Sequence, residues 1–337
     1  MNIFKATKRR AATTVIATAA AVVTQFVPAQ AEERYPSRPI EIVVPFSPGG
    51  SGEMSARVIQ PALEEALGQP IVVVTRPGAA TNIGTFSVVK AKPDGYTLLM
   101  GATALTANPH IYEDLEFDPL KDLVPITIVA NSPLMLAANP ELGVKNAQDV
   151  IKLAKERPGE LNFASSGIGS SAHLNGEYFK HVAGVDVQHV PYNGGGPAML
   201  AVTSGEVGLI SSNVANLQGL VDSDELVPIG VAASERSSML PDVPTFKELG
   251  FDLVGGAYRG IAVPKSTPEA LREKISNIFA DINKIPALRD KAESLGFAPI
   301  DIPYRDVRKF IEEKRADYLK LAEEAGIGLS PQRRNSP

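Results

Sequence analysis

Three loops rich in glycine and serine carry the residues whose types and spacing best suit ligand chemistry. They span residues 47–52 (SPGGSG), 165–171 (SSGIGSS) and 192–197 (YNGGGP), and a helical pattern follows each of them. Backbone N–H groups at a helix start lack intrahelical partners, and the helix dipole favours negative charge there. Glycine admits a ligand to that backbone, and serine adds hydroxyl donors. One such loop is as often a plain turn, but three together favour a shared anion pocket.

No lysine or arginine lies in these loops, so anion binding there would rest on amides, hydroxyls and water. The two arginines that could contribute are Arg57, on the first predicted helix, and Arg259, much later in the chain. We interpret each as a solvated or salt-bridged side chain, the usual state of an arginine.

Other ligand and reaction classes find little support in the motifs. Gly167 to Ala172 (GIGSSA) formally matches the dinucleotide pattern G-x-G-x-x-A, with Asp186 following 19 residues after Gly167. Asp186, however, precedes the next predicted strand, whereas the ribose-binding acid of that motif should end it. The first loop lacks the phosphate-binding lysine of G-x-x-x-x-G-K-[ST], and no G-x-S-x-G nucleophile elbow occurs. We therefore expect no cofactor and no enzyme activity.

Metal and thiol chemistry are similarly restricted. The chain has no cysteine, which excludes disulfides, zinc–thiolate sites and cysteine nucleophiles. Its four histidines are His110, His173, His181 and His189, and no H-E-x-x-H motif occurs among them. We expect no metal site. His173 begins a helix beside the second loop, where it either lines a pocket or is an ordinary packing or surface histidine.

The first 31 residues are typical of a secretory signal peptide. A positive segment (Lys5, Lys8, Arg9 and Arg10) precedes an alanine-rich apolar run at 11–27 and an A-Q-A site ending at Ala31. We expect cleavage after Ala31 and a periplasmic location; the alternative, an uncleaved anchor, fits the short, threonine-interrupted run less well. Removing these residues changes the formal net charge from −5 to −9. A net negative charge of this size argues against a nucleic-acid partner.

Alternating apolar runs and helical patterns predict an α/β fold. Strands are expected at 40–44, 71–75, 96–100, 161–164, 187–190, 207–211 and 227–232, with extended segments at 125–140 and 258–263. Helices are expected at 51–67, 82–91, 147–156, 173–182, 197–204, 268–282, 286–294 and 306–324, and a frayed tail after 328. Continuous apolar strands joined by helices favour parallel sheets, which bind ligands at their strand ends.

Several longer stretches resemble the Bug family, the TctC-like extracytoplasmic receptors of tripartite tricarboxylate transporters. They include YPSRPIEIVVPFSPGG, LNFASSGIGSSAHLNGE, VQHVPYNGGGPAMLAVTSGEV and the spacing R-P-G-A…N-I-G…P-D-G-Y-T-L-L, and the similarity runs from Tyr35 to about Gly328. The resemblance implies a two-lobed type II periplasmic-binding-protein clamshell, each lobe a doubly wound sheet flanked by helices. Lobe 1 would comprise 32–131 and 258–337, lobe 2 would comprise 132–257, and the hinge would lie near 130–133 and 257–260.

The loops and the family pattern together select the candidate ligand-binding residues. These are Ser47, Pro48, Gly49, Gly50, Glu53, Asn82, Thr103, Ser165, Ser166, Gly167, Ser170, Ser171, His173, Tyr192, Ser212 and Asn213. Two of them depart from the family, which commonly has aspartate where this chain has Glu53 and aspartate before Asn213, where it has Ser212. Loss of an acid at Ser212 makes an amino-acid ligand less expected than a simple carboxylate.

The resemblance implies a monomeric periplasmic solute-binding protein. It would close on a di- or tricarboxylate or an aromatic carboxylate and deliver it to the permease subunits of a tripartite transporter. Two alternatives stay open at this point. One is a ligand sensor for a receptor kinase, and the other is a secreted α/β enzyme.

Overall fold

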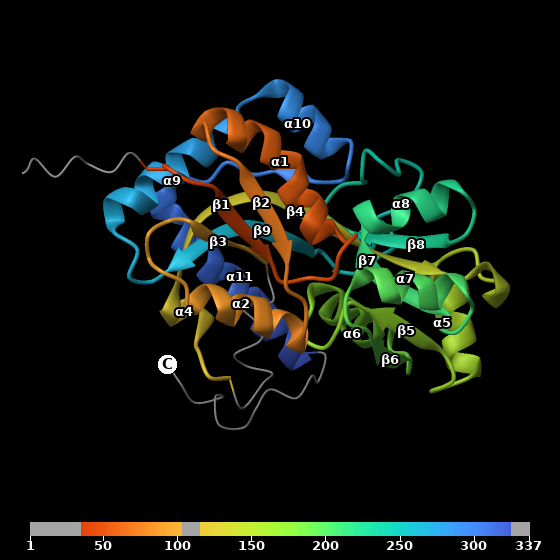
Figure 1. Cartoon of the computed structure of the whole chain (residues 1–337). Coiled ribbons are helices and arrows are strands. Elements are labelled where there is room, and N and C mark those ends of the chain that lie inside the picture. Colours follow the sequence, from red (N-terminus) through yellow and green to blue (C-terminus); the bar gives the residue numbers. More distant parts are fainter. Residues whose placement is uncertain (1–34, 103–114, 325–337) are drawn as a thin grey trace, which may run out of the picture. The chain divides into compact units, whose positions relative to one another are not determined.

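Two mixed β-sheets share one long strand, β4 (Leu123–Ala138), in the computed structural model, which describes residues 35–102 and 115–324 (Figure 1). The described residues from Pro36 onward belong to one compact unit. The first part of β4, up to Pro133, pairs with β9 (Gly256–Pro264). From Leu134, the same strand lies between β7 (Leu209–Asn213) and β8 (Val227–Ala232). The chain therefore passes from one sheet to the other inside a single strand.

The first sheet has the strand order β2-β1-β3-β9-β4. Its parallel part consists of β1 (Ile40–Val44), β2 (Ile71–Thr75) and β3 (Thr97–Ala102), whereas β9 and the short β10 (Ala298–Pro299) run antiparallel to β4. Its helices are α1 (Ser51–Leu67), α2 (Asn82–Val89), α4 (Pro119–Asp122), α9 (Glu269–Ile282), α10 (Pro286–Glu293) and α11 (Tyr304–Glu324). In Figure 1, α1 and α10 lie on one side of the sheet, and α2 and α11 on the other.

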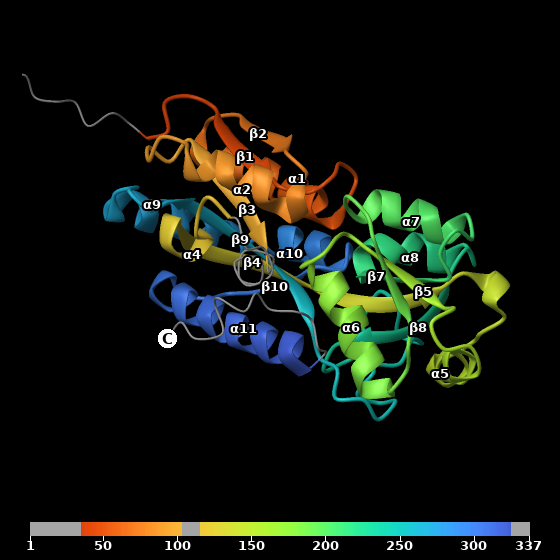
Figure 2. The ribbon, with the colours of Figure 1, turned by 90° about the horizontal axis from the view of Figure 1, so that it is seen from below.

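The second sheet has the order β8-β4-β7-β5-β6, in which β5 (Asn162–Ser165) is parallel to β6 (Gln188–Pro191) and β7. Figure 2 shows helices on both sides of this sheet. One face buries an aromatic core under α5 (Ala147–Glu156) and α6 (Ser171–Ala183), with Phe163 and Phe179 at its centre. The other face packs against α7 (Gly195–Thr203) and α8 (Val214–Asp222). Gly176 lets α6 approach the sheet closely, because a Cβ there would overlap the ring of Phe163.

Several predicted elements have the expected bounds, namely β1, α1, β2, α5 and β8. The other predicted elements differ from the observed ones by one or two residues at one or both ends. The sheets are mixed rather than wholly parallel, because β4, β8 and β9 run antiparallel to their partners. The sequence prediction missed α8, whose asparagine, glutamine and glycine interrupt its apolar pattern.

The predicted hinge positions coincide with the point where β4 changes partners, since Pro133 pairs with Gly256 and Leu134 with Asn213. The division into two lobes at these positions stays a prediction. The predicted signal peptide and the tail after 328 lie outside the described residues. Among the helices that the structure describes, none combines the length and the apolar character needed to cross a membrane.

Candidate ligand-binding site

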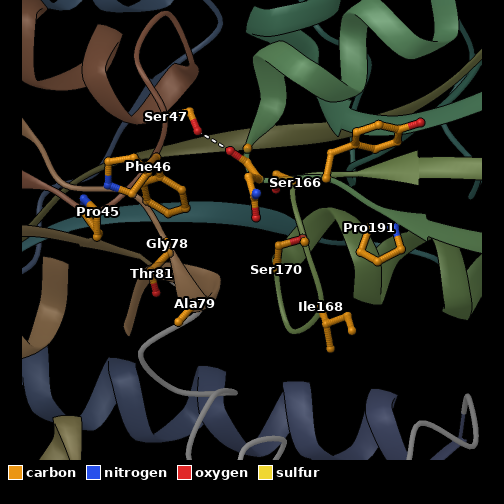
Figure 3. A pocket seen from close by; sticks show the side chains of 15 residues that line it. Pro45, Phe46, Ser47, Gly78, Ala79, Thr81, Ser166, Ile168, Ser170 and Pro191 are labelled. Atoms are coloured by element: carbon orange, nitrogen blue, oxygen red, sulfur yellow. Dashed lines mark hydrogen bonds between the residues drawn. The ribbon is translucent and has the colours of Figure 1, made fainter. Parts of the chain in front are cut away.

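A cavity of about 240 Å³ lies where loops from the two sheets face each other (Figure 3). Four loops line it, each at the carboxyl end of a parallel strand, where open α/β sheets bind ligands. They contribute Pro45, Phe46 and Ser47 after β1; Pro77, Gly78, Ala79 and Thr81 after β2; Ser166, Gly167, Ile168 and Ser170 after β5; and Pro191, Tyr192, Asn193 and Gly194 from β6 and the loop after it. None of these lining residues carries a charged side chain. We call this space the outer cavity.

A smaller space of about 30 Å³, the inner cavity, adjoins the outer one and shares Phe46, Ser47, Ser166 and Ser170 with it. Its remaining lining residues are Gly50, Ser51, Gly52, Ser171, Ala172, Gly195, Ser212, Asn213, Asn216 and Arg259. This volume suits about one or two water molecules or one small polar group. The described lining contains several hydroxyls, one cation and no acidic side chain.

Four helices begin at the inner cavity, namely α1, α6, α7 and α8. The residue before α6, Ser170, accepts a hydrogen bond from the backbone N–H of His173 (3.1 Å). Gly50, Gly194 and Asn213, which precede the other three helices, make no such side-chain cap. The positive ends of four helix dipoles therefore converge on a space whose described lining includes no acidic side chain, which favours an anion.

Two hydroxyls of the first loop and helix bind residues of the second sheet. The Ser47 hydroxyl donates to the Asn193 carbonyl, and the Ser51 hydroxyl donates to Oδ1 of Asn213 (2.8 Å). The Asn213 amide in turn donates to the carbonyl of Ser132 in β4 (3.2 Å). Gly194, at φ 119°, makes room for Ser47, because a Cβ at this glycine would overlap the serine side chain. These contacts hold the loops of the two sheets together around the cavities.

Arg259 is the one charged residue that lines the inner cavity in the described structure. It lies on β9 opposite Ala130 of β4 and is 3% exposed. Its Nη2 donates to the Ser51 hydroxyl (2.9 Å) and to Oδ1 of Asn213 (3.4 Å), and its guanidinium carbon lies 5.4 Å from the centre of the Phe46 ring. Burial lowers the pKa of Arg259 to about 10, so it stays protonated at neutral pH.

Arg259 is therefore not solvated, and no carboxylate of the described residues pairs with it, so the sequence interpretation is wrong here. The same interpretation is correct for Arg57, whose side chain is half exposed and forms a salt bridge with Glu53 (3.1 Å). The burial of Arg259 depends on residues distant in sequence, since its partner Ser51 is 208 positions away.

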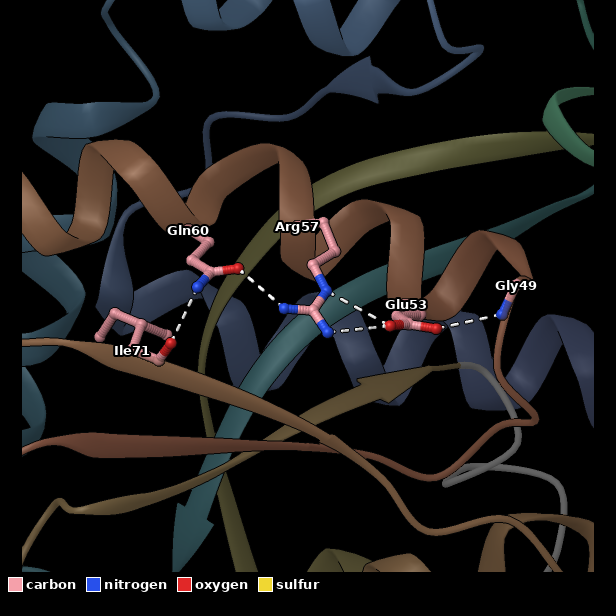
Figure 4. A network of polar contacts seen from close by, with 5 residues as sticks. All are labelled: Gly49, Glu53, Arg57, Gln60 and Ile71. Carbon is pink, nitrogen blue, oxygen red and sulfur yellow. Dashed lines mark hydrogen bonds and ion pairs between the residues drawn. The ribbon is translucent and has the colours of Figure 1, made fainter.

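Glu53 points along α1 and lines neither cavity (Figure 4). Its Oε2 accepts a hydrogen bond from the backbone N–H of Gly49 (3.0 Å), while its Oε1 binds Arg57. The Gly49 N–H is the main cause that lowers the pKa of Glu53 below its usual value. Arg57 extends the network to Gln60, which donates to the carbonyl of Ile71 (2.9 Å). Glu53 thus supports the start of α1, in the manner of a helix-capping glutamate.

A layer of buried and half-buried side chains supports the loop after β5. Nδ1 of His173 accepts a hydrogen bond from the backbone N–H of Gly169 (3.2 Å), and Nε2 of His189 bonds to the Ser165 hydroxyl (2.7 Å). The two imidazole centres lie 4.1 Å apart. Burial lowers the pKa of His173 to about 4 and that of His189 to about 3, so both rings are neutral at neutral pH.

Glu177 joins this layer, and its carboxylate and the two imidazoles place possible metal-ligand atoms within 4.8 Å of one another. Sequence spacing gave no sign of this group, because His189 comes from a neighbouring strand. The Glu177 carboxylate is, however, already bound by Lys180 (2.8 Å).

Comparison with known proteins identifies the chain. The family model described as "Tripartite tricarboxylate transporter family receptor" (TctC) matches residues 55–327. The chain belongs to this family. Among its relatives, protein BugT of Bordetella pertussis is 33% identical over 300 residues, covering 88% of this chain and 92% of BugT. As a member of a receptor family, the chain is a solute-binding receptor and not an enzyme, which removes the secreted-enzyme alternative.

Solved structures agree with this assignment. The structure of Rpa4515 of R. palustris with adipate has a TM-score of 0.84 and 31% sequence identity, covering 87% of this chain and 98% of that one. The structure of the periplasmic binding protein BugD has a TM-score of 0.82 and 27% sequence identity, covering 87% of this chain and 99% of BugD. The structure of MatC (Rpa3494) from Rhodopseudomonas palustris with bound malate has a TM-score of 0.79 and 26% sequence identity, covering 85% of this chain and 99% of MatC. The receptor thus has the α/β clamshell fold of periplasmic binding proteins.

The sequence-predicted site residues of the TctC receptor fall into three sets. Those that line the cavities are Ser47, Gly50, Ser166, Gly167, Ser170, Ser171, Tyr192, Ser212 and Asn213. Those that line neither are Pro48, Gly49, Glu53, Asn82, Ser165 and His173, while Thr103 lies outside the described residues. Ligand contact by any of them stays a prediction.

The loop after β2 is the main part of the cavity lining that residue patterns did not single out. Pro77, Gly78 and Ala79 follow a predicted strand directly, the same signal that marked the other loops. Within this loop Ala79 (φ 44°) and Thr81 (φ 79°) adopt left-handed backbone conformations, which are costly for residues other than glycine. Strain of this kind concentrates at ligand sites, in agreement with the position of both residues on the cavity wall.

Proposed function

We propose that this TctC receptor binds a small organic carboxylate, with one carboxylate group in the inner cavity and the rest of the molecule in the outer cavity. The observation that carries the proposal is the convergence of four helix starts on a space whose described lining includes no acid. A carboxylate placed there accepts hydrogen bonds from backbone N–H groups and serine hydroxyls and lies at the positive ends of the dipoles.

The lining of the outer cavity supports a ligand with an apolar portion. Phe46, Ile168 and several prolines lie on its wall, while Ser166, Ser170 and Asn193 offer polar groups for a second substituent. The relatives described above hold adipate and malate, which are both dicarboxylates. A dicarboxylate or an aromatic carboxylate is therefore the class of ligand that we expect.

The Ser212 side chain argues against an amino-acid ligand. Ser212 lines the inner cavity, where its hydroxyl accepts a hydrogen bond from the Asn216 amide (3.0 Å). A ligand ammonium group placed there finds no acidic side chain among the described lining residues, and it lies near the positive charge of Arg259. A simple carboxylate makes no such unfavourable contact.

Family membership supports a role in uptake. We propose that the receptor is exported by its first 31 residues, works in the periplasm as a monomer, and presents the ligand-bound form to the permease subunits of a tripartite transporter. Closure would rotate the predicted lobes about the segment where the paired strands β4 and β9 pass from one predicted lobe to the other, in the manner of hinge-bending receptors. A sensor for a receptor kinase is the alternative that the same binding site allows.

A thermal-shift panel tests the proposed function. The panel contains adipate, malate, succinate, citrate and benzoate, the primary amides of the same acids, and aspartate and glutamate. We expect at least one simple carboxylate to raise the Tm, confirmed by calorimetry, and its amide to have little effect. Stabilisation by aspartate or glutamate alone, or by amides as strongly as by acids, would contradict the proposal.

A further inference from the structure

We propose that Arg259 is a specificity-determining residue whose counter-ion is the carboxylate of the bound ligand. The inference rests on the proposed function, because it assigns a partner to a charge in the same inner cavity. It goes further by naming the side chain that makes this receptor prefer an acid over the corresponding neutral molecule.

The charge of Arg259 is buried without a counter-ion among the described residues. The side chain is 3% exposed, and the described structure places no carboxylate within ion-pair distance of it. Its hydrogen-bond partners, Ser51 and Asn213, are both neutral. Its Nε is buried and has no hydrogen-bond partner. Buried charges in proteins are normally paired, because an isolated charge loses the solvation that water gives it. Arg259 therefore lacks an anion that the ligand can supply.

The position of Arg259 directs this charge at the cavity. Arg259 lines the inner cavity, and the Ser51 hydroxyl that its Nη2 contacts lies at the first turn of α1, on the same cavity wall. Because Ser51 donates its own hydrogen to Asn213, the guanidinium, serine and asparagine form one connected polar group. A carboxylate in the inner cavity then faces both the helix starts and a fixed cation among buried side chains, where water screens charge interactions less than at the surface.

A purely structural role is the competing explanation. The guanidinium joins β9 of the first sheet to Asn213 of the second and lies over the Phe46 ring, so that Arg259 serves as a link between the sheets. Such a link would matter for stability whether or not a ligand is present, and it would not distinguish an acid from its amide. The two roles therefore predict different ligand dependence.

The test measures the affinity of the wild type and of Arg259→Gln for one matched pair of probes by calorimetry. The pair is the acid of the panel that raises the Tm most and its primary amide, for example adipate with adipamide or benzoate with benzamide. Glutamine keeps an amide donor but removes the charge. Arg57→Gln is the matched control, since it removes an arginine of the neighbouring helix that lines neither cavity. Arg259→Lys restores a positive charge without the planar guanidinium.

We expect Arg259→Gln to weaken binding of the acid by about 30-fold or more and to leave binding of the amide within about threefold. Arg57→Gln should bind the acid like the wild type, and Arg259→Lys should recover part of the loss. The inference fails if Arg259→Gln binds the acid as tightly as the wild type, or loses acid and amide equally.

Three further outcomes are decisive. If Arg259→Gln does not fold, Arg259→Lys takes its place, because it loses the planar guanidinium. Weaker binding of the acid with unchanged binding of the amide supports the inference, whereas unchanged acid binding, or equal losses for acid and amide, overturns it. If the wild type binds acids and Arg259→Gln does too, the proposed function survives and only this inference falls. A wild type that no acid of the panel stabilises overturns both.

Discussion

Buried His173 and its half-buried neighbour His189 predict a loss of stability on mild acidification. Burial lowers the pKa of His173 from 6.5 to about 4, with a smaller contribution from the charge of Lys180. The folded state therefore favours the neutral ring, whereas the unfolded chain protonates near pH 6.5. The stability associated with the neutral ring is present above pH 6.5 and is lost as the pH falls towards 4.

The size of the effect follows from the two pKa values. At pH 5, the free energy of unfolding attributable to His173 is about 2 kcal/mol lower than at neutral pH. For a chain of this size, whose unfolding entropy at about 2.1 cal/mol/K per residue is about 0.6 kcal/mol/K, this corresponds to a fall in Tm of about 3 °C. His189, whose pKa burial and the neighbouring His173 lower to about 3, adds to the loss in the same direction.

Calorimetric melting of wild type and His173→Asn at pH 7 and pH 5 tests this reasoning. Asparagine can keep an acceptor for the Gly169 N–H but cannot titrate in this range, so the variant should lose about 2 kcal/mol less than the wild type between the two pH values. His181→Asn is the matched control, because it removes an exposed imidazole from the same helix. An equal loss in wild type and His173→Asn would refute the assignment.

Three substitutions around the cavities give further expectations. Gly50→Val should abolish carboxylate binding and leave the fold intact, because Gly50 lines the inner cavity at φ −87° and an added Cβ contacts only the Ser47 carbonyl at 3.5 Å. Gly219→Val, on α8 with open space beside it, is its control; calorimetry showing equal affinities would exclude Gly50 from the site. Ser212→Asp should weaken acid binding by about tenfold or more through charge repulsion, and unchanged affinity would place the carboxylate elsewhere. Glu53→Ala should lower the free energy of unfolding by about 1 kcal/mol at pH 7 without changing affinity; an altered affinity would give Glu53 a role at the ligand.

The parallel parts of both sheets could be predicted because local patterns determine them. Continuous apolar runs and glycine or proline at their ends located β1, β2 and α1 at their observed bounds. The loops after β1, β5 and β6 followed from the same reasoning, since carboxyl ends of parallel strands lie at one edge. The antiparallel pairing of β4 and β9 could not follow from composition, because these strands are far apart in sequence and meet only in the folded chain.

The candidate site was predictable as a set of loops but not as a charge distribution. A glycine-rich loop before a helix indicates accessible N–H groups from sequence alone. Whether an arginine is solvated or buried depends on what packs over it, and for Arg259 this is Phe46 and the start of α1. For the same reason, the sequence identified Glu53 as unusual but could not show that its carboxylate binds Gly49 and Arg57 rather than facing the pocket.

The most direct test of the central claim is a crystal structure of the receptor with the acid that stabilises it most. Our account predicts one carboxylate group in the inner cavity, within hydrogen-bond distance of the Ser51 hydroxyl or the Arg259 guanidinium, and the rest of the molecule in the outer cavity. A ligand bound outside these two cavities, or one whose carboxylate faces solvent, would contradict it.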